Sequence, residues 1–247
     1  MAPPTPWSRL GVHLEHFLED EDDPVIGAWA VGQGTNAPDR QLFRHLLRFL
    51  VQASGGRPVS VLEVGCGSGI QLQGLLDDGL APEAVRYTGY DFTPELVDVC
   101  RKKFPTHEFQ TRDMLGMNDD RTADVVVSRS VLEHVEEGKL GLANLFRATR
   151  IVTVVAWFVR PTWNDVEAGI HIADGFVHQR YAIRDLLAFV RELRPALFCR
   201  FDFDHGIHEW SVWLLWREPP RDGALAAIHS YLASEEFERA VLPRLSA

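Results

Sequence analysis

Hydrophobic and polar positions follow two periods in this chain, one of helices and one of strands. From residue 39 onward, leucines and phenylalanines recur at helical spacing up to residue 53, and Asp39 is expected to cap that helix. Val59–Val64 is a short, continuous apolar run that predicts a buried strand. A glycine-rich loop follows this run, and the next pattern predicts a helix that ends near Gly79.

The same alternation of strand and helix continues to the end of the chain. Further strands are expected over 85–90, 107–111, 123–128, 150–159, 196–204 and 209–216, and further helices from Pro94, capped by Thr93, and over 137–148, 182–194 and 224–239. Strands that are apolar on both faces belong inside a covered sheet. The pattern therefore predicts an α/β fold: a doubly wound, mostly parallel seven-stranded sheet, with helices on both faces and a C-terminal antiparallel hairpin.

Two segments depart from this alternation. Residues 160–181 are read as an irregular 22-residue insertion of a kind that tends to be functional, and we expect it to build the acceptor pocket. Residues 1–38 precede the first helix of the fold and mix aromatic residues with an acidic run. They are expected to form a lid in which Gln33 or Gly34 touches a ligand, so the domain itself spans 39–247.

Composition narrows the classes of function. The chain has 247 residues, is 46% hydrophobic and carries a net charge of −10, so it lacks the basic surface that nucleic acids or anionic membranes require. No apolar run is long enough to span a bilayer, and no signal pattern opens the chain, which favours a cytoplasmic protein. Three cysteines far apart in the sequence indicate neither a disulfide framework nor a metal site.

The glycine loop, Val-Gly-Cys-Gly-Ser-Gly over residues 64–69, has three interpretations. A phosphate loop would need a nearby lysine, and none precedes Lys102. A dinucleotide site would place its third glycine at position 70, which is Ile70, and its acid closer than Asp91, which is 26 residues after Gly65. A methyl-donor site tolerates an acid before the glycines, because S-adenosylmethionine carries a cation and no phosphate.

At this point a family resemblance emerges. The segment "VLEVGCGSG" resembles the first motif of class I S-adenosylmethionine-dependent methyltransferases, and "YTGYDFTPELVDVCRKKF", "FQTRDM" and "ADVVVSRSVLEHV" resemble its later landmarks in the same order. The terminal hairpin is similar to the antiparallel seventh strand of that family. The resemblance covers about residues 39 to 217 and implies S-adenosylmethionine as the cofactor.

The resemblance also implies roles for individual residues. Asp91 would accept the ribose hydroxyls, and a capping role for it is disfavoured because Thr93 is expected to cap the next helix. Phe92 would pack on the adenine, with core packing as an equal alternative, and Asp113 would accept the adenine amine, with a turn aspartate as the alternative. The expected cofactor-binding residues are Glu63, Gly65, Cys66, Gly67, Gly69, Asp91, Phe92, Asp113, Met114, Ser128 and Arg129.

Three histidines are the candidates for a general base, because imidazole titrates near neutral pH. They are His134, His171 and His178, and for each a merely structural or solvated role stands beside the catalytic one. The expected reaction is methyl transfer to the oxygen, nitrogen or carbon of a small molecule, plausible in secondary metabolism. A cofactor-binding regulator without turnover and an NAD-dependent oxidoreductase stay open as alternatives, as do a monomer and a homodimer.

Overall fold

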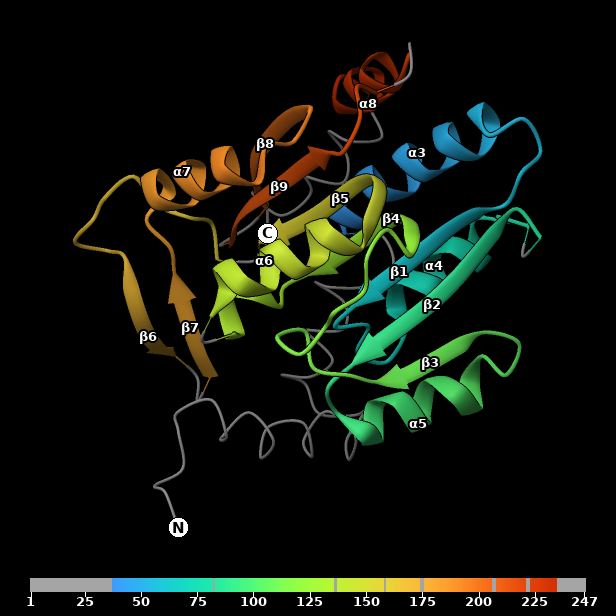
Figure 1. Cartoon of the computed structure of the whole chain (residues 1–247), viewed down its shortest axis with the longest axis horizontal. Helices are drawn as coiled ribbons and strands as arrows, with labels where there is room; N and C mark the ends of the chain where they lie inside the picture. Colours follow the sequence, from blue (N-terminus) through green and yellow to red (C-terminus); the bar gives the residue numbers. More distant parts are fainter. Residues whose placement is uncertain are drawn as a thin grey trace, which may run out of the picture.

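One seven-stranded sheet forms the centre of the protein (Figure 1). The computed structural model describes residues 37–81, 83–135, 137–157, 159–173, 176–205, 208–220 and 223–234. In spatial order the strands are β3 (Glu108–Thr111), β2 (Val85–Asp91), β1 (Val59–Val64), β4 (Ala123–Arg129), β5 (Thr149–Trp157), β9 (His208–Trp216) and β8 (Leu197–His205).

The first five strands are parallel and the last two form an antiparallel hairpin. β1 pairs with β2 on one side and with β4 on the other, so the order of strands along the chain reverses between β1 and β4. β9 runs antiparallel to β5, and β8 runs antiparallel to β9. This arrangement confirms the predicted fold class, and it places the glycine loop at the switch point, where doubly wound sheets bind their ligands.

Helices cover both faces of the sheet and define two apolar cores. α3 (Pro38–Ala53), α4 (Ile70–Asp77), α5 (Pro94–Lys103) and α8 (Ala224–Leu232) pack on one face, and α6 (Gly138–Ala148) and α7 (Ile183–Leu193) pack on the other. Neighbouring residues of one strand face opposite cores: Val61 belongs to the first and Leu62 to the second. This alternation explains why the strands read as continuous apolar runs.

Three expectations about local structure were wrong. The insertion at 160–181 is not irregular, since β6 (Gly169–Ala173) and β7 (Phe176–Arg180) pair as a separate antiparallel sheet. Asp39 does not cap α3, which begins after Ala37, and Thr93 does not cap α5 with its side chain. Asp39 instead pairs with Arg129, and the hydroxyl of Thr93 has no hydrogen-bond partner among the described residues.

The proposed lid at 1–38, including Gln33 and Gly34, lies outside the described residues except for its last two positions. The helix expected over 224–239 ends earlier, at Leu232, and residues 235–239 lie outside the described part. Within the part of the chain that the structure describes, no helix is long and apolar enough to cross a membrane.

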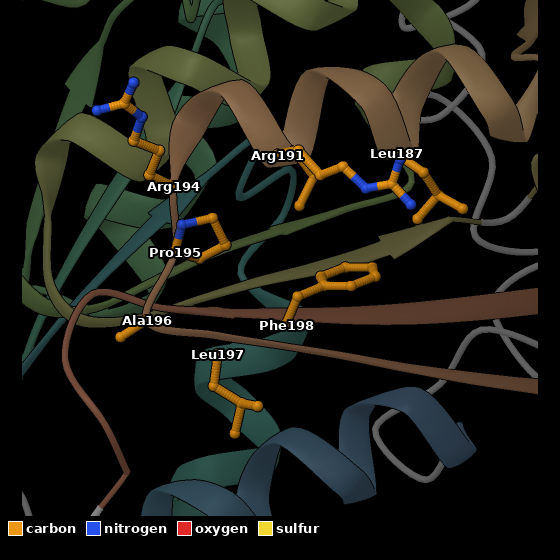
Figure 2. A pocket seen from close by; sticks show the side chains of 8 residues that line it. Leu187, Arg191, Arg194, Pro195, Ala196, Leu197 and Phe198 are labelled. Atoms are coloured by element: carbon orange, nitrogen blue, oxygen red, sulfur yellow. The ribbon is translucent and has the colours of Figure 1, made fainter.

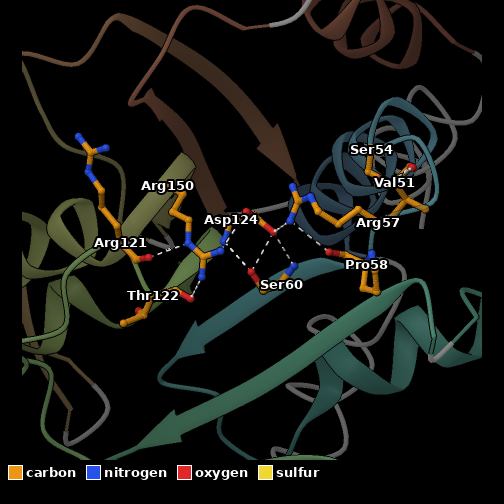
Figure 3. Close-up of polar contacts among 9 residues, drawn as sticks. All are labelled: Val51, Ser54, Arg57, Pro58, Ser60, Arg121, Thr122, Asp124 and Arg150. Atoms are coloured by element: carbon orange, nitrogen blue, oxygen red, sulfur yellow. Dashed lines mark hydrogen bonds and ion pairs between the residues drawn. The ribbon is translucent and has the colours of Figure 1, made fainter.

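A buried carboxylate joins β1 to β4 at the amino end of these strands (Figure 3). Oδ2 of Asp124 accepts hydrogen bonds from the backbone N–H and the hydroxyl of Ser60 and from Nη1 of Arg57, each at 2.9 Å. Nη1 of Arg150 lies 3.5 Å from Oδ1 of Asp124. Burial opposes ionisation of Asp124, but the hydrogen bonds from Ser60 and Arg57 outweigh it, so the pKa of this carboxyl lies below the ordinary value of 3.8.

Replacing this carboxylate should destabilise the fold. Asp124→Asn loses the charge and places an amide against the donors of Ser60 and Arg57, so we expect the free energy of unfolding to fall by about 2 kcal/mol at pH 7. Because the folded-state pKa is depressed, the stabilisation is present above the unfolded pKa and is lost as the pH falls through the folded value. Urea unfolding from pH 7 down to pH 3 measures both effects, with the exposed Asp98→Asn as control. Equal losses in the two variants would contradict this role.

Candidate functional site

The glycine loop connects β1 to α4 at the carboxyl edge of the sheet. Gly65, Gly67 and Gly69 all have positive φ angles, of 79°, 54° and 79°. A Cβ atom built on Gly65 would lie 2.2 Å from Cγ2 of Val131, so this glycine is required by packing as well as by conformation. At Gly67 no heavy atom of the described residues lies within 4 Å of the added Cβ, so that part of the structure leaves the loop open there. A ligand can therefore approach the bare backbone at Gly67.

Asp91 at the end of β2 fastens this loop. Its Oδ2 accepts the N–H of Gly67 at 2.8 Å, and its Oδ1 accepts the N–H of Thr93 at 2.9 Å. Each carboxylate oxygen has two acceptor sites, so Asp91 keeps capacity for further hydrogen bonds. The argument that Thr93 makes a capping role of Asp91 superfluous was wrong, because the hydroxyl of Thr93 makes no cap and finds no partner among the described residues.

Of the next three predicted contacts, two are exposed and one is buried. Phe92 is 57% exposed, which contradicts the core-packing alternative. Asp113 is also exposed, and its Oδ1 accepts the N–H of Leu115 at 2.9 Å, so the turn geometry considered for it is present. Met114 is buried against α6, where the side-chain amide of Asn144 donates to its carbonyl at 2.9 Å.

A cluster of buried charges lies beneath the loop. The hydroxyl of Tyr87 donates a short hydrogen bond to Oε2 of Glu63, and burial raises the pKa of Glu63 to about 7 although the nearby Arg40 lowers it. Burial, together with the charge of Arg129, lowers the pKa of Arg40 to about 9. Nη1 of Arg40 donates to Oε1 of Gln71 at 3.2 Å.

Two donors of this cluster have no hydrogen-bond partner among the described residues. They are Nε of Arg40 and Nε2 of Gln71. Buried donors in folded proteins are almost always paired, so these two are suited to an acceptor that the chain itself does not supply. The sequence interpretation missed Arg40, Gln71 and Tyr87. A signal existed for Tyr87, because Val61 pairs with Tyr87 and Glu63 with Gly89 in the β1–β2 register, so Tyr87 and Glu63 share a face.

The end of β4 carries the remaining predicted cofactor contacts. The guanidinium of Arg129 forms a buried ion pair with Asp39 and lies 4.8 Å from the ring centre of Trp210. Ser128 is 1% exposed, and its hydroxyl has no partner among the described residues. Ser130 adopts a φ angle of 53°, which is unusual for a residue other than glycine. Asp39 thus joins the first turn of α3 to the end of β4.

Two of the three candidate histidines lie together. His134 ends the short 3-10 helix η2 (Leu132–His134), and its ring centre is 4.7 Å from that of His178 on β7. His171 pairs with His178 in the β6–β7 ladder, but its side chain lies outside the described part of the structure. The hydroxyl of Tyr181 donates to the carbonyls of Leu132 and Val135, at 3.0 and 3.2 Å. Tyr181 thereby holds the hairpin beside the loop that follows β4.

Cys66 and Cys100 are also brought together, although they are far apart in the sequence. Sγ of Cys100 lies 3.1 Å from the carbonyl oxygen of Gly67, and a hydrogen bond with Cys100, together with burial, raises the pKa of the Cys66 thiol. The Cys66 side chain is 5% exposed, so a ligand at this loop would meet its backbone. No group of three or more His, Cys, Asp or Glu residues among those described could hold a metal ion.

Comparison with known proteins finds a methyltransferase domain and methyltransferase folds. Residues 61–151 match the family model described as "Methyltransferase domain". Over most of the chain, the fold is similar to that of magnesium protoporphyrin IX methyltransferase from Synechocystis PCC 6803 with bound SAM. The TM-score is 0.61 at 14% identity, with coverage of 88% of this chain and 100% of that one. A didemethyltoxoflavin N1-methyltransferase of Burkholderia thailandensis gives a TM-score of 0.57 at 15% identity, covering 89% and 93%.

Curated relatives match over about half of this chain. A ubiquinone biosynthesis O-methyltransferase of Alkalilimnicola ehrlichii is 28% identical over 142 residues, which is 55% of each chain. A non-reducing polyketide synthase (mapC) of Penicillium brevicompactum is 26% identical over 143 residues, 52% of this chain and only 6% of that protein. The chain thus spans little more than half the length of one relative and a small part of the other. Residues 61–151 thus match a methyltransferase domain, and the fold over most of the chain is similar to that of solved methyltransferases, one of them with bound SAM.

The raised pKa of Glu63 has a measurable consequence for stability. Its contribution to stability is fully present below the unfolded pKa, near 4.5, and is lost as the pH rises through the folded value of about 7. We expect the stability of the wild type relative to Glu63→Gln to fall between pH 4.5 and 7, by at most about 1.4 kcal/mol per pH unit. Chemical denaturation across this range measures the slope.

The exposed Glu95→Gln on α5 is the matched control, and its stability difference from the wild type should stay flat over the same range. A flat difference for Glu63→Gln as well would show that this carboxyl titrates alike in the folded and unfolded states.

Proposed function

We propose that this protein transfers a methyl group from S-adenosylmethionine to a small-molecule acceptor. The observation that carries the proposal is the clamp between Asp91 and Gly67 at the switch point of the sheet, with the open face of Gly67 beside it. This clamp puts a carboxylate with spare acceptor capacity next to bare backbone, an arrangement suited to ribose hydroxyls. The exposed ring of Phe92, one residue further along, is available to stack on a base.

The buried charges favour a ligand with an amino acid end. The two unpaired donors of Arg40 and Gln71 suit a carboxylate, and the carboxyl of Glu63 suits an ammonium group. A pyrophosphate would instead face the acids Glu63 and Asp91, and no lysine precedes Lys102 in the chain to offset them. The residues present therefore fit S-adenosylmethionine better than a dinucleotide, and we assign its binding to Glu63, Gly65, Cys66, Gly67, Gly69, Asp91 and Phe92.

The other predicted cofactor contacts are assigned different roles. Asp113 keeps its candidate role at the adenine amine because its carboxylate is exposed. Met114, Ser128 and Arg129 are assigned to shaping the site, because Met114 packs against α6 and the Arg129 guanidinium pairs with Asp39.

The acceptor is proposed to bind beneath the β6–β7 hairpin, on the face of the sheet that carries α6 and α7. When bound, the cofactor supplies an electrophilic methyl group on a sulfonium. The residues of this chain would place the acceptor, exclude water and take up a proton where the acceptor atom carries one. His134 and His178 are the proposed proton acceptors, because their rings meet where the hairpin faces the end of β4.

The comparisons support a small acceptor rather than a macromolecule. The two methyltransferases matched in ubiquinone biosynthesis and in toxoflavin methylation are named for small molecules, and a polyketide synthase also matches over the same domain. These names favour biosynthetic chemistry on an oxygen, nitrogen or carbon atom. The lid at 1–38 and the acceptor role of 160–181 are part of the proposal.

Calorimetry tests the cofactor assignment. S-adenosylhomocysteine should bind the wild type, and Asp91→Asn should weaken binding by about tenfold or more through the loss of charge-assisted hydrogen bonds. Phe92→Ala is the sharper variant, since an exposed side chain can be removed with little effect on stability, and it should weaken binding by about fivefold. Asp98→Ala is the control. Tighter binding of NAD, or unchanged binding in both site variants, would overturn the assignment.

Turnover tests the proposed base. Release of S-adenosylhomocysteine would be followed with panels of phenols, enolisable β-dicarbonyl compounds and amines. For an acceptor that is turned over, His178→Asn or His134→Asn should lower kcat by about 10²-fold or more while cofactor affinity stays unchanged. Unchanged kcat in both variants would remove the histidines from the mechanism. Cofactor binding without turnover of any acceptor would favour the regulator instead.

A further inference from the structure

A groove lies between the end of α7 and the beginning of β8, outside the site described above. Its volume is about 470 Å³. Its lining consists of Leu187, Val190, Arg191, Arg194, Pro195, Ala196, Leu197 and Phe198. Six of these eight residues are apolar, and both charged ones are arginines. The volume falls within the range of sites for small molecules, which combine an apolar lining with a few polar groups.

The two arginines have no counter-ions in the described structure. Arg191 and Arg194 are exposed, and neither makes an ion pair or a side-chain hydrogen bond with a described residue. Elsewhere on α7, Arg184 lies 3.7 Å from Asp165, so an exposed arginine of the same helix does find a partner. The chain has a net charge of −10, so two guanidinium groups without ion-pair partners among the described residues make this apolar groove a locally positive region.

The backbone at Arg194 adds an independent observation. This residue ends α7 in the left-handed conformation, with φ 53° and ψ 54°. Glycine is the usual residue at such a helix end, because a side chain is strained there. Arg194 therefore holds a long cationic side chain in a conformation that is strained for residues other than glycine, and such outliers cluster where proteins bind ligands.

The groove is remote from the glycine loop. β8 and β5 are both antiparallel to β9, so β8 runs in the direction of the parallel strands and its first residues lie at their amino edge. The glycine loop follows the carboxyl end of β1. A ligand in the groove would thus occupy the opposite edge of the sheet from the cofactor.

We propose that this groove binds a small apolar carboxylate as a second ligand site of the protein. The apolar part of the ligand would pack on Leu187, Val190 and Phe198, and its carboxylate would accept hydrogen bonds from Arg191. Figure 2 shows the Arg191 side chain extending along α7 toward Leu187, above the ring of Phe198, while Arg194 extends away at the helix end. Arg191 is therefore the principal anion contact, and Arg194 adds positive charge at the rim.

Binding of octanoate to the full-length protein tests this site. Amide chemical shifts in ¹H–¹⁵N spectra should move saturably at Leu187, Val190 and Phe198, and saturating S-adenosylhomocysteine should not displace the probe. Arg191→Gln should weaken octanoate binding by about tenfold, the loss expected for one charge-assisted contact, and Arg191→Lys should restore part of it. Arg184→Gln is the matched control because it removes the same charge from the same helix outside the groove.

Probes of different charge distinguish recognition of the carboxylate from nonspecific hydrophobic binding. Octanol and octylammonium should bind more weakly than octanoate. Equal binding of octanoate and octylammonium, unchanged affinity in Arg191→Gln, or the absence of saturable shifts at the groove would each overturn the proposal. Shifts in the free protein that depend on protein concentration, and that are lost in Arg191→Gln, would instead identify the groove as a contact between two copies of the chain. These outcomes do not depend on methyl transfer.

Discussion

The structure depends on one carboxylate, that of Asp91, which holds the end of β2 to the turn after β1. In a parallel sheet the N–H groups of a loop beyond the end of its strand leave the ladder, so they need other acceptors. Asp91 accepts one from Gly67 and one from Thr93, which fixes both the glycine loop and the start of α5. Together with the N–H groups of Gly65 and Cys66, which donate to the carbonyl of Tyr90 at 2.7 and 3.0 Å, this pair of hydrogen bonds holds the loop against the end of β2.

The site also contains several buried ionisable groups. Asp39 and Arg129 join α3 to β4, and Glu63, Tyr87 and Arg40 gather beneath the loop. Removing ions from water is costly, so such groups are retained only where they are paired or where they meet a ligand. The pKa shifts of Glu63 and Arg40, toward their neutral forms, show that burial is not fully compensated within the described residues. A ligand that carries both charges would complete the compensation.

The sequence predicted the strands and the glycine loop well, but it predicted the polar side-chain contacts less well. Runs such as Val59–Val64 predict strands because burial on both faces leaves no polar position, and the glycines identify the loop through their backbone requirements. The role of Asp39 was misjudged because capping is a local inference, whereas its partner Arg129 lies on a distant strand. The hydroxyl of Thr93 makes no cap, and nothing in the local sequence indicates this. Arg40 and Gln71 carry no motif at all, and only packing brings them together.

The attachment of the β6–β7 hairpin has a consequence for how such a protein can diversify. Thr162 donates its N–H to the carbonyl of Tyr181 at 2.9 Å, and Ile183 donates to the carbonyl of Thr162 at 2.8 Å, so the segment leaves and rejoins the body at one point. Residues 163–180 are therefore a closed loop on a fixed base. Their length and side chains could be changed by mutation or by grafting while the sheet and the loop that follows β1 keep their geometry, so the proposed acceptor pocket could diverge separately from the proposed cofactor site.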